Sequence, residues 1–82
     1  MAIDRAVLWR QLKEGLTHLL DSMAPQLAAE DRKLVMEFID NREFGLALEW
    51  LHSVIAEKNL RPSASEASEI QRLAALMHIE LP

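Results

Sequence analysis

Hydrophobic positions recur at helical spacing in four stretches of the chain, and no stretch alternates as a strand does. Pro25 and Pro62 interrupt this pattern, because the residue before a proline disfavours helical backbone. Ser63 and Glu66 form an S-x-x-E capping box that marks a helix start. Asn59 is expected to end the third helix in a left-handed conformation. The predicted helices span residues 4–23, 27–40, 43–58 and 64–78.

Short connections between the predicted helices make consecutive helices antiparallel neighbours. The expected fold is therefore all-α, a compact single domain of about four short helices over residues 1–82. Gly15 lies inside the first helix, where it costs about 1 kcal/mol relative to alanine, so we expect a neighbouring helix to approach closely there. The predicted core comprises Leu12, Leu16, Leu34, Phe38, Leu48, Leu51, Ile70 and Leu73.

Composition narrows the classes of protein that fit this pattern. Half of the 82 residues are hydrophobic, which is too many for a disordered tail, yet no apolar run approaches the roughly 20 residues that cross a bilayer. Charged residues interrupt any secretory signal near the N-terminus, and the chain has no cysteine. The net charge of −4 argues against direct binding of nucleic acid. We therefore expect a cytoplasmic protein with no membrane segment.

Two carboxylate–histidine pairs have metal-binding spacing. Glu49 and His52 form the E-x-x-H pair that di-iron bundles use twice, and Glu14 precedes His18 by one helical turn. A di-iron site needs a second E-x-x-H pair and two further inward glutamates, whereas Glu49 falls opposite the core face of its helix. Both pairs are interpreted as solvated surface pairs, and no metal or other cofactor is expected.

Catalysis and DNA binding are also unsupported by the pattern. Ser53 adjoins His52, but neighbouring residues on a helix diverge by about 100°, so they cannot form a nucleophile–base pair. A helix-turn-helix arrangement would present Glu43, Glu49 and Glu57 to phosphates, which repels DNA. We expect no catalytic residue, and the protein is predicted not to be an enzyme.

The net charge of the chain is confined to its middle. Acidic and basic residues balance in residues 1–33 and 58–82, so the whole charge of −4 lies in residues 34–57. Leu46 and Trp50 lie off the core stripe of the third helix, and an exposed aromatic side chain with a charged rim is typical of a protein-binding patch. Packing of Trp50 under the first or fourth helix remains open. The candidate partner-binding residues are Glu37, Asp40, Glu43, Leu46, Glu49, Trp50, Ser53 and Glu57.

The middle of the chain resembles a known family. Residues 38–51 (FIDNREFGLALEWL) resemble the second and third helices of MafI-type immunity proteins, which are similar to some immunity proteins of contact-dependent inhibition. Residues 63–77 resemble the last helix of that family, while the first helix has no recognised counterpart. The resemblance implies a bacterial cytoplasmic protein that binds and neutralises a cognate secreted toxin domain. Such toxins are often nucleases with basic clefts, which an acidic helical face would complement.

The residues alone indicate an acidic helical module that binds another protein. The alternative is a regulatory or structural module that self-associates through Leu46 and Trp50. A two-fold interface would bring the acidic residues of both copies together, so a monomer is favoured over a homodimer.

Overall fold

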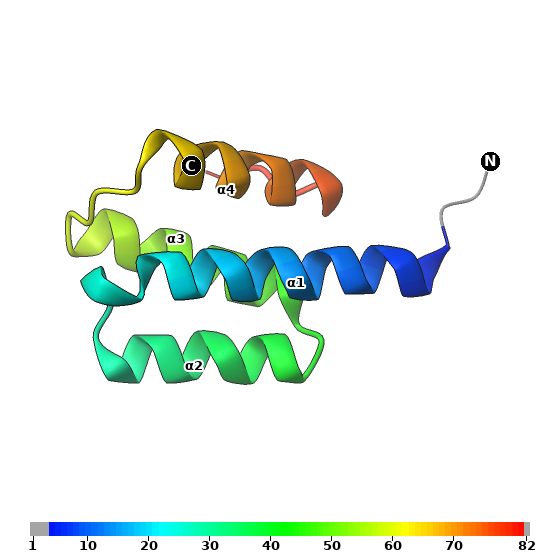
Figure 1. The fold of residues 1–82 in the computed structure, drawn as a ribbon, viewed down its shortest axis with the longest axis horizontal. Coiled ribbons are helices and arrows are strands. Elements are labelled where there is room, and N and C mark those ends of the chain that lie inside the picture. Colours follow the sequence, from blue (N-terminus) through cyan, green and yellow to red (C-terminus); the bar gives the residue numbers. More distant parts are fainter. Residues whose placement is uncertain (1–3, 82) are drawn as a thin grey trace.

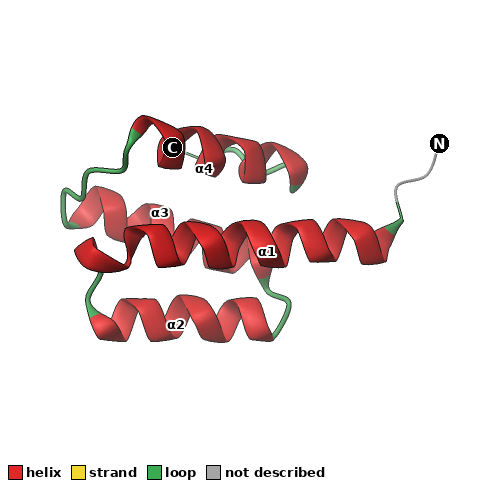
Figure 2. Ribbon diagram, in the orientation of Figure 1, coloured by secondary structure: helices red, strands yellow, loops and turns green. Residues whose placement is uncertain are grey.

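The computed structural model describes residues 4–81, which form an all-α domain. Its four helices are joined by short loops, and no strand occurs in this range (Figure 2). The hydrophobic periodicity therefore predicted the fold class correctly. The helices are α1 (Arg5–Met23), α2 (Ala29–Asp40), α3 (Phe44–Glu57) and α4 (Ala64–Leu76), with a short 3₁₀ turn, η1 (Ala24–Gln26), directly after α1.

Consecutive helices run antiparallel around the long α1 (Figure 1). α2 packs mainly on α3, and α1 packs mainly on α4. α1 has 19 residues, whereas the other helices have 12 to 14. As a result, the N-terminal turns of α1 project beyond the end of the other helices (Figure 1).

Side chains cap the N-termini of α1 and α4. The carboxylate of Asp4 accepts a hydrogen bond from the amide of Ala6. The predicted capping box is present in α4, where the Ser63 hydroxyl accepts from the amide of Glu66 and the Glu66 carboxylate accepts from the amide of Ser63. Each contact satisfies a backbone N–H group that has no partner within the helix.

Three helices end on a residue with left-handed backbone. Asn59 has a φ angle of 52°, which confirms its predicted role, and Arg42 and His78 have φ angles of 59° and 55°. In each case the next amide donates back to a carbonyl five residues earlier, as in the Schellman motif. Arg42 and His78 were not predicted, because left-handed backbone is costly for most residues with a Cβ atom and is better tolerated by asparagine. These bonds join Glu43 to Phe38, Leu60 to Ile55 and Ile79 to Ala74, at 2.8, 3.0 and 2.9 Å.

Most of the predicted core is buried, but two of its members on α2 are not. Leu34 and Phe38 are half-buried, and the buried residues of α2 are Val35 and Ile39. Val35 and Ile39 directly follow Leu34 and Phe38 in the sequence, so the buried side of α2 is centred nearer to Val35 and Ile39, with Leu34 and Phe38 at its edge. The predicted residues that are buried are Leu12, Leu16, Leu48, Leu51, Ile70 and Leu73.

Gly15 lies where α1 meets α4. A Cβ atom at this position would lie 2.8 Å from Cδ2 of Leu73 and 3.2 Å from side-chain atoms of Arg72 and Glu69. The close helix approach predicted from Gly15 is therefore present, and the missing side chain makes room for Leu73.

Candidate functional site

All eight predicted partner-binding residues are exposed, and they lie on α2, on α3 and in the turn between them. Leu46 and Trp50 retain 49% and 42% of their accessible surface. The Trp50 ring lies against Phe38 of α2, with ring centroids 6.4 Å apart and a tilt of 54°. Trp50 thus lies at the junction of α2 and α3. The alternative left open by the sequence, that Trp50 packs under the first or fourth helix, is wrong.

Four apolar side chains form a continuous surface where α2 meets α3. Leu34 precedes Phe38 by one helical turn on α2, and Leu46 precedes Trp50 by one turn on α3. The ring contact between Phe38 and Trp50 joins the two pairs. We call these four residues the α2–α3 seam.

Sequence reasoning assigned Leu34 and Phe38 to the core and so missed their place in this seam. They are half-buried because they lie at the edge of the buried side of α2, whose centre is occupied by Val35 and Ile39. The signal that could have identified them is the width of the apolar stripe on α2. Leu34 with Phe38 and Val35 with Ile39 form two neighbouring apolar pairs at i, i+4 spacing. One buried helix face does not require both pairs, so one pair is expected at the edge of that face.

Five exposed carboxylates lie on the same two helices as the seam and in the turn between them, and we call them the acidic rim. Within residues 4–81, none of the five forms an ion pair or a side-chain hydrogen bond. Glu43 and Glu49 lie three residues before and after Leu46, which places both within about one turn of it. The rim therefore keeps its charge available to a partner. Its members are Glu37, Asp40, Glu43, Glu49 and Glu57.

The ion pairs of the described chain lie outside the acidic rim. They join Arg32 to Asp21, Lys58 to Asp31, and Arg72 to Glu69. Lys58 follows the C-terminal end of α3, and its hydrogen bond to Asp31 joins this end to α2. The same hydrogen bond raises the pKa of Lys58.

The one basic residue of the middle segment, Arg42, forms no ion pair with the rim within residues 4–81. The Arg42 guanidinium lies over the Trp9 ring of α1, 4.6 Å from the ring centroid. Folding therefore preserves the charge imbalance that the sequence places in residues 34–57.

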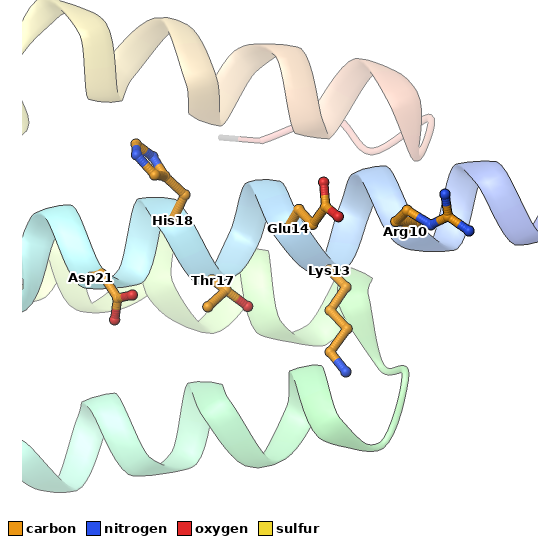
Figure 3. Close-up of a pocket in the computed structure, with 6 residues that line it drawn as sticks. All are labelled: Arg10, Lys13, Glu14, Thr17, His18 and Asp21. Carbon is orange, nitrogen blue, oxygen red and sulfur yellow. The ribbon is translucent and has the colours of Figure 1, made fainter.

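Among residues 4–81, neither carboxylate–histidine pair belongs to a larger group of potential metal ligands. No group of three or more His, Asp or Glu residues in the range 4–81 is arranged to hold a metal ion. Glu14 and His18 border an open hollow whose lining comes from α1 alone, and their side chains do not converge on a common point (Figure 3). Glu49 is exposed, and neither it nor His52 has a third ligand beside it.

Comparison with family models, curated proteins and solved structures gives no match for this chain. The resemblance to MafI-type immunity proteins therefore rests on residues 38–51 and 63–77 alone. Across residues 4–81, every helix is too short or too polar to cross a membrane.

Proposed function

We propose that this protein is a non-enzymatic immunity protein that binds a basic toxin domain through the α2–α3 seam and its acidic rim. The observation that carries the proposal is an exposed aromatic side chain, Trp50, on the same two helices and turn as five carboxylates that have no ion-pair partner within the described chain. A toxin domain is proposed as the partner because residues 38–51 and 63–77 resemble MafI-type immunity proteins.

Two physical properties suit the seam to protein binding. Trp50 is exposed, yet its ring is positioned by Phe38, so less side-chain freedom is lost when a partner covers it. Partly exposed aromatic residues of this kind often supply a large share of binding energy, whereas charges at the rim mainly accelerate association.

The acidic rim favours a basic partner over a second copy of the chain. A two-fold dimer through Trp50 would place ten carboxylates around one small apolar patch, and unpaired like charges disfavour such contacts. A basic nuclease cleft would instead neutralise the rim, and the rim would occupy the place of the nucleic-acid phosphates.

The test compares two double variants that change the net charge equally. Glu37→Lys/Glu57→Lys alters the rim, while Glu14→Lys/Glu80→Lys alters exposed carboxylates elsewhere. The partner is the toxin domain encoded beside the gene in its native host, and binding is measured by surface plasmon resonance at several salt concentrations. We expect the rim variant to slow association at least about tenfold more than the control and to weaken its salt dependence.

Trp50→Ala tests the aromatic contact separately. We expect faster dissociation, with a loss of about 2 kcal/mol or more, and reduced protection of cells that express the toxin. Circular dichroism must show an intact fold for each variant. If reversal at Glu37, Glu49 and Glu57 together leaves the binding rate and the protection unchanged, the partner does not use this face.

A further inference from the structure

A second apolar surface lies at the end of the molecule from which α1 projects. An open groove of about 420 Å³ lies there between α1, the turn before α3, and the segment that follows α4. Its principal lining residues are Leu8, Trp9, Arg42, Phe44, Met77 and Ile79. We call this surface the end groove.

The groove exists because the apolar stripe of α1 is longer than the bundle that covers it. Trp9, Leu12 and Leu16 follow one another at spacings of three and four residues, so they lie on one side of α1. Leu12 and Leu16 are buried, but Trp9 is 37% exposed. The N-terminal turns of α1 project beyond the other helices (Figure 1), and Trp9 lines the groove together with Phe44 of α3 and Leu76 of α4. The stripe that forms the core thus continues to Trp9, which the neighbouring segments cover only in part.

Arg42 gives this apolar surface a positive charge. Its left-handed backbone ends α2, and its guanidinium lies on the Trp9 ring. A stacked guanidinium keeps its N–H groups free at its edge. Within residues 4–81, the Arg42 side chain has no carboxylate partner, although the chain as a whole carries an excess of four negative charges. The groove lining contains no carboxylate at all.

We propose that the end groove binds an apolar segment of another protein that carries a carboxylate close to its apolar side chains. The apolar side chains would cover Trp9, Leu8 and Ile79, and the carboxylate would accept hydrogen bonds from the edge of the Arg42 guanidinium. A second copy fits less well, because a two-fold contact at this end would bring Arg42 of both copies together. This inference does not depend on the toxin-binding proposal, since it concerns the opposite charge and a different face.

The experiment uses three synthetic amphipathic helical peptides with leucines on one face. The other face carries glutamate in the first, glutamine in the second and lysine in the third. Each is titrated into the ¹⁵N-labelled full chain and followed by two-dimensional NMR. We expect the glutamate peptide to bind most tightly and to shift the backbone amides of the groove lining.

Variants assign the binding to the groove. Arg42→Gln should weaken the glutamate peptide about tenfold and leave the glutamine peptide unchanged, while Trp9→Ala should weaken both. Arg42→Lys should retain part of the charge-dependent binding, because it keeps the charge without the planar donor edge. Lys33→Gln is the matched control: it removes one exposed positive charge on α2 and should change neither affinity.

Several results would overturn the proposal. Equal affinity for the glutamate and glutamine peptides would remove the role of the carboxylate, and tighter binding of the lysine peptide would reverse the charge preference. Shifts confined to the α2–α3 seam would place binding elsewhere. A dimer in sedimentation velocity that Trp9→Ala dissociates would show that a second copy fills the groove.

Discussion

Gly15 and Gly45, the two glycines of the chain, allow the same substitution to be tested in two different environments. Alanine at a helical glycine ordinarily stabilises a protein by up to about 1 kcal/mol, because alanine loses less backbone entropy on folding. We expect Gly15→Ala to destabilise this protein and Gly45→Ala to stabilise it or leave it unchanged. Both glycines lie in helices with negative φ, so the difference depends on packing alone.

The magnitudes follow from what a Cβ atom would meet. At Gly15 it would lie 2.8 Å from Cδ2 of Leu73, a side chain with no exposed surface into which it could move. Overpacking of a core costs about 1–3 kcal/mol, which exceeds the gain in helix propensity, so a net loss of about 1 kcal/mol is expected. At Gly45 the nearest atom is Cδ1 of Ile79 at 3.3 Å, the end of a half-buried side chain, and a gain of up to about 0.5 kcal/mol is expected.

Urea unfolding followed by circular dichroism measures both changes. A loss of 1 kcal/mol in a domain of this size lowers Tm by about 4–8 °C, which thermal unfolding resolves. In a Leu73→Ala background the clashing atom is absent, so Gly15→Ala should lose its destabilising effect. A rise in stability for Gly15→Ala in the unmodified chain would refute the close approach of α1 and α4.

Three further predictions concern the core, acid stability and metal binding. Leu51→Ala should lower the free energy of unfolding by about 2–5 kcal/mol in urea, because Leu51 is buried in the centre of α3; an unchanged midpoint would contradict this. The hydrogen bond from Ser22 lowers the pKa of Glu66 in the folded protein. The ionised Glu66 carboxylate therefore stabilises the fold above its ordinary pKa of 4.5, and this stabilisation is lost as the pH falls through the lower pKa of the folded state. Acid titrations of Tm should therefore fall less steeply below about pH 4.5 in Glu66→Gln than in the unmodified chain. Added Zn²⁺ or Fe²⁺ should not raise Tm, whereas a rise that Glu49→Ala or His52→Ala removes would restore the E-x-x-H pair as a metal site.

Local interactions explain why much of the fold is encoded directly in the sequence. Residue spacing produces four amphipathic helices, the prolines interrupt them, and Ser63 with Glu66 caps the last one through contacts three residues apart. Asn59 tolerates left-handed backbone, and Gly15 marks a close helix contact because no other residue leaves that space. The charge imbalance follows from the order of charged residues in the sequence. The exposure of Leu46 and Trp50 follows from their position around α3, away from its buried side.

Tertiary packing decided what no single helix determines. Spacing defines an apolar stripe on α2, but only packing against the other helices decides that Val35 is buried and that Leu34 and Phe38 are half-buried, with Phe38 against Trp50. The end groove likewise depends on tertiary structure, since α1, the turn before α3 and the segment after α4 come together to form it and leave Trp9 partly exposed. The helical period determines which residues lie on one side of a helix. The packing angles and lengths of the neighbouring helices determine which of those residues are exposed to solvent.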